Sequence, residues 1–420
     1  MAIMHIDANS AYLSWTAVKM LAEGSGMDIR DVPSVIAGDP KNRHGIILAK
    51  SIPAKKFGIR TGESLFEARR KCPELLVFPH DFSLYLSFSD EMYRLISEYS
   101  PIIQRYSVDE CFLDYTGSEA TFGEPMACAH EIRNRIRDEL GFTVNIGVSS
   151  NKLLAKMASD FEKPDRVHSL FPEEIEEKMW PLPVEDLFMV GRATARRLRK
   201  VNINTIGDLA RSDRAFIRKI LKSHGDMIWQ YANGIDDSLV IPNREIEQKG
   251  VGNSTTVDHD VSDKKEAHMI LLALTERVTA RLRRMEKFAY IVSVTITSSD
   301  FIRYGHQLKL DMATDSTSEI YAHVCRLFDE VWKGEKIRHL GVSLSELTEE
   351  CEISMNLFSE DKSESQRAAD SAVDQIREKF GDKAIMRGIF VNQNTDHMQG
   401  GIRSAKSGDS NYIVMGGKKV

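Results

Sequence analysis

Three carboxylates in two short segments carry the clearest chemical signal in this chain. Asp7 follows an apolar run at residues 3–6, and Asp109-Glu110 interrupt the strand-like stretch 102–113. Burying an unpaired carboxylate is costly, so a divalent metal ion is a suitable partner for these residues. Three carboxylates at one spot could hold two Mg²⁺ ions, an arrangement that binds both the attacking and the leaving oxygen in phosphoryl transfer.

The metal hypothesis sets a condition on the backbone. Neighbouring residues of a strand point to opposite faces, so Asp109 and Glu110 can share a metal only if the chain turns there, for example at a hairpin. The alternative is that both are simply polar residues of a turn. The residues alone leave both interpretations open.

Length and composition describe a globular protein of several domains. At 420 residues the chain is long enough for two to four domains, and its 42% hydrophobic and 28% charged residues are typical of such proteins. We find no apolar run of about 18 residues and no signal peptide, so we expect no membrane span. The five cysteines show no C-x-x-C spacing, which predicts reduced thiols in a cytosol and no zinc site.

The net charge of −6 hides strongly basic stretches. Local basic surface, rather than net charge, is what binds nucleic-acid phosphates. The richest stretch, between Met189 and Lys222, has only two acidic residues, and a solvated helix face is the alternative interpretation. Its basic residues are Arg192, Arg196, Arg197, Arg199, Lys200, Arg211, Arg214, Arg218, Lys219 and Lys222.

Strands and helices alternate through the first part of the chain. The pattern predicts a strand at 2–7, a helix at 10–22, a hairpin at 102–115 with the carboxylate pair near its turn, and a helix at 124–140. Such an order implies an α/β sheet layer covered by helices.

The pattern then changes twice. Residues 172–234 predict short helices, with a segment at 189–194 that resembles a helix-hairpin-helix, although Met189 stands where the first of its two usual glycines would be. An ordinary helical turn is the alternative. Residues 252–344 predict the order βαββαβ, a small sheet with two helices on one face, and 370–380 could form one more helix.

Taken together, these motifs resemble those of a Y-family DNA polymerase of the lesion-bypass type, and the resemblance covers residues 1–348. Each motif alone is weak, but in this order and at these separations the set is highly specific. The motifs are His5-Ile6-Asp7, Ala54-Lys55-Lys56-Phe57-Gly58, Ser107-Val108-Asp109-Glu110, and Gly147-Val148-Ser149-Ser150-Asn151-Lys152 through Lys163-Pro164.

The resemblance implies an α+β multidomain fold, a right-hand polymerase with a palm, short fingers, a helical thumb and a βαββαβ little-finger domain. The implied boundaries are 1–13 and 81–168 for the palm, 14–80 for the fingers, 169–240 for the thumb, 241–248 for a linker, 249–348 for the little finger and 349–420 for a C-terminal extension with a mobile tail.

The resemblance also implies the catalytic residues. Asp7, Asp109 and Glu110 would be the catalytic carboxylates, and with the backbone carbonyl of Ala8 they would hold two Mg²⁺ ions, for which Mn²⁺ can substitute. Tyr12 would be a steric gate against the ribose 2′-OH; the alternative is a core aromatic residue.

Two lysines of this chain, Lys55 and Lys163, would contact the triphosphate. The family usually has Arg where this chain has Lys55 and Tyr where it has Ile52. Ile52 cannot hydrogen-bond a phosphate and Lys55 cannot make a bidentate fork, so we expect the pocket to grip the triphosphate less firmly or differently.

The implied DNA contacts are Gly191 and Arg192 in the hairpin and Arg303 in the little finger. A segment at 354–358 resembles a sliding-clamp-binding peptide without its usual leading Gln, and a local hydrophobic contact is the alternative. Its clamp-binding residues would be Met355, Leu357 and Phe358.

The function expected is low-processivity, template-directed DNA synthesis by two-metal-ion catalysis, in translesion synthesis and DNA repair. The expected partners are primer–template DNA, a dNTP and a sliding clamp, with no membrane, and we expect a monomer in the bacterial cytoplasm, associated with the nucleoid. Two alternatives remain open: a nucleotidyl cyclase or nuclease, and a catalytically weak polymerase-like DNA-binding protein that needs a partner.

Overall fold

The computed structural model describes residues 1–38, 45–349 and 362–391. They form two compact units, the first built from residues 1–38 and 46–246 and the second from 247–349 and 362–391. The predicted clamp-binding residues Met355, Leu357 and Phe358 lie outside the described residues.

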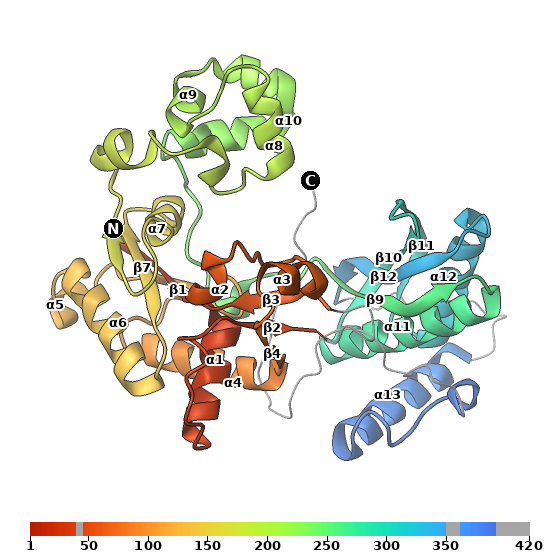
Figure 1. The fold of residues 1–420 in the computed structure, drawn as a ribbon. Helices are drawn as coiled ribbons and strands as arrows, with labels where there is room; N and C mark the ends of the chain where they lie inside the picture. The colour runs from red at the N-terminus through yellow and green to blue at the C-terminus, as the bar shows by residue number, and fades with distance from the viewer. Residues whose placement is uncertain (39–44, 350–361, 392–420) are drawn as a thin grey trace. The chain divides into compact units, whose positions relative to one another are not determined.

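A five-stranded sheet in the order β5-β6-β1-β7-β8 organises the first unit. Its strands β1 and β7 are labelled in Figure 1. The central strand β1 is buried along its whole length and is antiparallel to both of its neighbours, whereas β7 and β8 are parallel. The strands are β1 (Ile3–Ala8), β5 (Ile103–Arg105), β6 (Glu110–Asp114), β7 (Val144–Ser149) and β8 (Val167–Ser169).

Alternation along β1 divides its side chains between two layers. Met4 and Ile6 join the large core formed with α1, α4 and α6, whereas Ile3 packs with Ala155 of α7 on the opposite face. Asp7 has the same parity as Ile3 and therefore faces the α7 side of the sheet. The helices are α1 (Ala11–Ala22), α4 (Phe82–Ile96), α5 (Glu119–Phe122), α6 (Pro125–Leu140) and α7 (Lys152–Ser159).

A small three-stranded sheet in the order β3-β2-β4 lies between α1 and α4 in the sequence. Its two helices are short, and each starts at a serine whose hydroxyl accepts a backbone N–H: Ser51 from Ala54 and Ser64 from Glu67. The elements are β2 (Ser34–Ala37), β3 (Ile47–Lys50), β4 (Leu76–Pro79), α2 (Ile52–Lys56) and α3 (Leu65–Lys71).

Helices alone follow after β8, as predicted, but they are not all short. The helix α10 (Arg214–Ala232) has 19 residues, and Lys222 breaks its regular backbone with φ 57° and ψ −141°. The other two helices are α8 (Arg192–Arg199) and α9 (Ile206–Arg211), and all three share one hydrophobic core.

The second unit has the predicted βαββαβ order. Its sheet is fully antiparallel in the order β11-β10-β12-β9, and both helices contribute to one core with it. The elements are β9 (Gly250–Val261), α11 (Lys264–Arg284), β10 (Phe288–Ser298), β11 (Arg303–Thr314), α12 (Thr317–Val331) and β12 (Ile337–Thr348).

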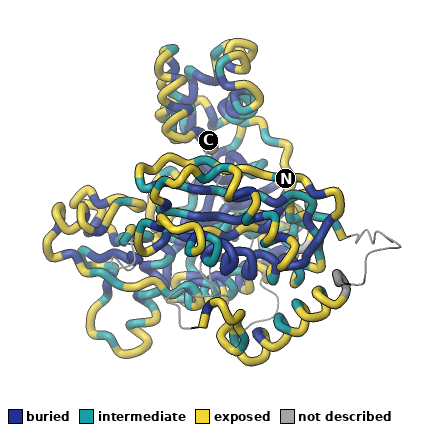
Figure 2. Tube along the Cα trace, turned by 90° about the vertical axis from the view of Figure 1, so that its right-hand side faces the viewer, coloured by how far each residue is buried: buried dark blue, intermediate teal, exposed yellow. Residues whose placement is uncertain are grey.

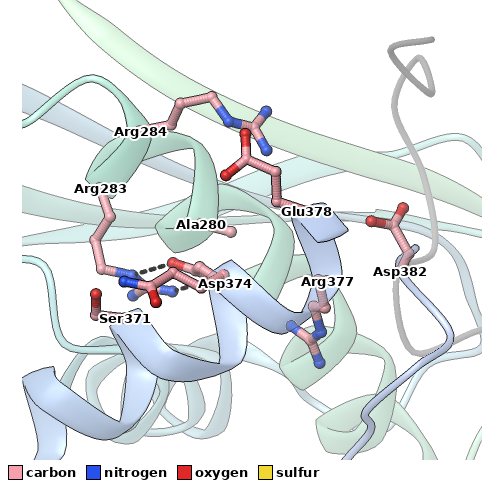
Figure 3. Close-up of a pocket in the computed structure, with 9 residues that line it drawn as sticks. Ala280, Arg283, Arg284, Ser371, Asp374, Arg377, Glu378 and Asp382 are labelled. Carbon is pink, nitrogen blue, oxygen red and sulfur yellow. Dashed lines mark hydrogen bonds and ion pairs between the residues drawn. The ribbon is translucent and has the colours of Figure 1, made fainter. Parts of the chain in front are cut away.

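A last helix, α13 (Lys362–Phe380), is longer than the predicted helix at 370–380 and packs on α11 through charged side chains (Figure 3). Arg283 of α11 donates to both carboxylate oxygens of Asp374 at 2.6 and 3.1 Å. Glu276 of α11 is only 3% exposed and pairs with Arg377 at 2.8 Å and with Arg387. The segment 362–391 is therefore attached to the second unit by buried ion pairs.

Buried residues line the interior of both units while outer helix faces are exposed (Figure 2). Among the described cysteines, Cys72, Cys111, Cys128 and Cys325 are all free thiols. No helix in the described ranges is long and apolar enough to cross a membrane.

Candidate active site

Two adjacent strands bring Asp7 and Glu110 side by side. Asp7 is the register partner of Glu110 across the β1–β6 ladder, and the backbone N–H of Ala8 donates to the carbonyl of Asp109 at 3.0 Å. The chain turns between β5 and β6, where the N–H groups of residues 106 and 107 both donate to the carbonyl of Glu110. The predicted hairpin is thus confirmed, with the carboxylate pair at its turn.

Asp109 is held at the end of this turn by Ser107. The Ser107 hydroxyl donates to Asp109 Oδ1 at 2.6 Å. Burial raises the pKa of Asp109 to about 6, and the negative charges of Glu110 and Asp7 act in the same direction. The carboxylates therefore repel one another, which favours a cation between them.

Two lysines supply positive charge at this site. Lys163 Nζ lies 2.6 Å from Asp7 Oδ2, and Lys156 Nζ lies 3.1 Å from Glu110 Oε1 and 3.7 Å from Asp7 Oδ2. Both lysines also pair with Asp160, at 2.8 Å from Lys163 and 3.4 Å from Lys156. Carboxylates from two strands and ammonium groups from α7 and the segment after it thus form one network.

The donor set fits a divalent metal, although the carboxylates are not arranged as a ready ligand set. Three carboxylates and a backbone carbonyl are the oxygen donors that Mg²⁺ prefers. Throughout residues 1–38, 45–349 and 362–391, no group of three or more His, Cys, Asp or Glu side chains is placed to hold a metal ion. In this structure Lys163 donates to Asp7 and Ser107 donates to Asp109.

His5 and Lys156 also belong to this network, although neither was predicted as a site residue. His5 is fully buried, with Nδ1 2.8 Å from the hydroxyl of Ser159 and Nε2 3.6 Å from Glu110 Oε2. Burial alone would raise the pKa of Glu110, but His5 and Lys156 outweigh it and lower the pKa to about 2. The available signal was a lysine inside the apolar run at 153–158, since lysine is rarely buried unless it is paired.

Tyr12 lies on α1, only half-buried, within an aromatic cluster. Its ring stacks on Tyr85 with centroids 4.3 Å apart and an interplanar angle of 7°, and it meets the edge of Phe82 at 6.0 Å. The carbonyl of Tyr12 accepts a hydrogen bond from Thr16 at 2.7 Å. Both the ring and the backbone of Tyr12 are thus held in place.

The other predicted contact residues lie on separate elements. Lys55 is exposed in the last turn of α2 and makes no ion pair in the described part of the chain. Gly191 is the N-cap residue of α8 and Arg192 is its first residue. Arg303 is exposed at the start of β11 in the second unit.

The backbone of the hairpin before α8 shows how Met189 can replace the first glycine of the helix-hairpin-helix motif. Met189 has φ 72°, in the left-handed region that favours glycine, whereas Gly191 has φ −80°, which any residue adopts. The residue that replaces the first glycine of the motif has therefore kept the backbone conformation of glycine.

Models of protein families match most of the chain. Residues 6–160 match the impB/mucB/samB family, residues 248–357 match the C-terminal domain of that family, and residues 172–203 match the helix-hairpin-helix motif of the same family. The three matches follow the order of the sheet unit, the helical region and the βαββαβ unit.

Curated relatives align over nearly the full length. The chain is 48% identical to DNA polymerase IV of Clostridium acetobutylicum over 93% of this chain and 98% of that protein. It is 37% identical to DNA polymerase IV of Acetivibrio thermocellus and 34% identical to DNA polymerase IV 2 of Bacillus subtilis, again over more than nine-tenths of each protein.

Solved structures share the fold at low sequence identity. A Y-family DNA polymerase chimera of Dbh and Dpo4 matches with a TM-score of 0.71 at 20% identity, covering 83% of this chain and 99% of the chimera. DinB from Sulfolobus solfataricus matches with a TM-score of 0.56 at 20% identity, covering 82% of this chain and 98% of that one.

The carboxylate-bearing sheet with its appended helical and βαββαβ parts defines a right-hand polymerase fold, so the predicted α+β multidomain class is confirmed. The chain belongs to the Y family of DNA-directed DNA polymerases.

Proposed function

We propose that the chain extends primer–template DNA with dNTPs at low processivity and copies damaged templates in translesion synthesis. The observation that carries this proposal is the placement of Asp7 and Glu110 as register partners beside Asp109, with Lys156 and Lys163 in contact with them. The family supplies the reaction class, and the site supplies groups suited to it.

In this proposal the three carboxylates and the carbonyl of Ala8 hold two divalent ions, Mg²⁺ or Mn²⁺. Such ions, when bound, lower the pKa of the primer 3′-OH and stabilise the pyrophosphate leaving group. His5 and Lys156 orient Glu110, and Ser107 orients Asp109. Lys55 and Lys163 bind the triphosphate, and Tyr12 excludes a 2′-OH.

The same proposal assigns residue ranges to the domains of a right-hand polymerase. Residues 1–13 and 81–168 act as the palm, 14–80 as the fingers, 169–240 as the thumb and 249–348 as the little finger. Within the described residues of 14–80, the helices that follow α1 are α2 and α3, of five and seven residues, which supports an open site for damaged template bases. Gly191, Arg192 and Arg303 contact the DNA backbone, which carries no sequence preference.

Primer extension on an undamaged template tests the reaction. Wild type with Mg²⁺ and four dNTPs should give short, distributive products, and Asp109→Ala should give none while still binding primer–template. Asp138→Ala, which removes an exposed carboxylate on α6, is the matched control and should extend like wild type. Extension by Asp109→Ala at the wild-type rate would contradict the assignment of the carboxylates.

A further inference from the structure

Asp7 contacts two lysines that differ in how free they are to move. The Lys156 side chain is 10% exposed and that of Lys163 is 36% exposed. Lys156 lies within α7, where the surrounding residues 153–159 are all buried. Lys163 lies beyond the end of that helix.

The two lysines also differ in their partners. Lys156 pairs with Glu110, Asp7 and Asp160, so losing one contact leaves it two others. Lys163 pairs only with Asp7 and Asp160 among the described residues. Lys163 can therefore leave Asp7 and keep Asp160, whereas Lys156 is buried and held from three sides.

The contact between Lys163 and Asp7 competes with metal binding. The ammonium lies 2.6 Å from Asp7 Oδ2, at hydrogen-bond distance, and a divalent ion at that oxygen would bind at about 2.1 Å. Two cations so close together repel strongly in a partly buried site. Asp7 therefore cannot offer Oδ2 to a metal ion while Lys163 remains hydrogen-bonded to that oxygen.

We propose that Lys163 couples divalent-ion binding to triphosphate binding. This inference rests on the proposed function, in which Lys163 contacts the triphosphate. A triphosphate draws Lys163 away from Asp7 and so frees a ligand for the ion, and an ion at Asp7 releases Lys163 to the triphosphate. By linkage, each ligand raises the affinity for the other by the same factor. Asp160 keeps Lys163 close to the site during the exchange.

Mn²⁺ alone is the probe that tests the competition at Asp7 on which the coupling depends. The full chain, without nucleotide or DNA, is titrated with Mn²⁺, and free Mn²⁺ is measured by electron paramagnetic resonance. Asp7→Asn identifies the part of the binding that belongs to this site. Lys163→Ala should bind Mn²⁺ there about fivefold more tightly or better, the lower end of typical coupling between sites.

Two control variants separate competition at Asp7 from a general charge effect. Lys163→Arg keeps the positive charge and should keep the wild-type Mn²⁺ affinity. Lys55→Ala also removes a predicted triphosphate contact, but Lys55 makes no ion pair in the described part of the chain, so its Mn²⁺ affinity should not change. Thermal unfolding of each variant verifies that it is folded.

Two results would overturn the coupling: an unchanged or weaker Mn²⁺ affinity in Lys163→Ala, or equal tightening in Lys55→Ala. Neither result would touch the proposed function, because that is tested by primer extension with the wild-type protein. The opposite result is also distinguishable. If the wild-type chain fails to extend primers while Lys163→Ala tightens Mn²⁺ binding, the polymerase proposal is wrong and the competition at Asp7 is still supported.

Discussion

At the scale of single residues, aromatic packing holds the ring of Tyr12, the proposed steric gate, in place. Its ring is stacked on Tyr85 and abuts the edge of Phe82, so it cannot easily swing aside. A barrier that discriminates by steric clash depends on such rigidity, because a mobile ring would yield to the larger sugar.

Replacing the ring tests this barrier. Tyr12→Ala should lower the preference for dNTP over rNTP by about 10-fold or more, in the range that pocket shape alone can supply. Tyr12→Phe keeps the ring and should keep most of the preference. The measurement is the ratio of kcat/KM for the two sugars, and an unchanged ratio in Tyr12→Ala would remove Tyr12 as the gate.

The candidate site was only partly predictable from the sequence. Asp7, Asp109 and Glu110 could be found because charged residues interrupt apolar runs there. The contacts of Lys156 could not, because its partners Glu110 and Asp7 are 46 and 149 positions away and only the β1–β6 register brings them together. The contact of His5 with Glu110 could not be predicted for the same reason, since only the sheet places the two side chains together.

At the scale of elements, the hairpin before α8 stores strain at one residue. Met189 is exposed and has φ 72°, a conformation that costs about 1–2 kcal/mol for a residue with a Cβ. Met189→Gly removes this strain but adds freedom to the unfolded chain, so we expect a net gain in stability of about 1 kcal/mol. Calorimetry of the full chain should show a higher unfolding temperature, and a lower one would contradict the strain.

Gly191 provides a separate test of the same hairpin. A Cβ added at Gly191 would meet no atom within 4 Å, and its φ is negative, so Gly191→Ala should leave the unfolding temperature unchanged. If the hairpin approaches DNA closely through its backbone, the added methyl group should weaken primer–template binding several-fold. Unchanged DNA affinity in a titration would mean that the hairpin does not need glycine for DNA.

The orientation of α13 does not follow from the hydrophobic pattern of its sequence. Its apolar residues Ile376 and Phe380 lie one turn apart and would be expected to face the core, yet they are 37% and 67% exposed. Charged residues make the contact with α11 instead: Asp374 pairs with Arg283, and the buried Arg377 reaches Glu276 across 101 positions of sequence. Only the folded structure brings such partners together, so the sequence predicted the helix without its orientation.

Breaking this pair should loosen the second unit. Arg377→Met keeps much of the side-chain volume but leaves the buried Glu276 with Arg387 alone, so we expect a loss of about 2–4 kcal/mol. The measurement is hydrogen exchange of α11 backbone amides. Arg326→Met, which breaks an exposed pair with Glu330, should cost about 0.5 kcal/mol or less, and equal effects would contradict the buried network.

At the scale of the whole molecule, charge distribution outweighs net charge. The chain carries a net charge of −6, yet the face of α8 presents Arg192, Arg196, Arg199 and Lys200 around one surface hollow. Arg199 is paired with Glu185, whereas Arg192 and Arg196 make no ion pair in the described part of the chain. We therefore expect DNA affinity to depend on a few local guanidinium groups and to fall steeply with salt.

Salt titration of DNA affinity tests this expectation quantitatively. Each arginine that neutralises one phosphate contributes about 0.9 to the slope of log K against log salt, so Arg192→Ala with Arg196→Ala should reduce the slope by about twice that value. Arg135→Ala is the charge-matched control, because Arg135 is already paired with Glu98 and Glu139. If all arginine variants changed the slope equally, the net charge rather than the α8 face would govern DNA binding. If only the α8 variants changed it, the negative net charge would be compatible with DNA binding, because Arg192 and Arg196 pair with no carboxylate among the described residues.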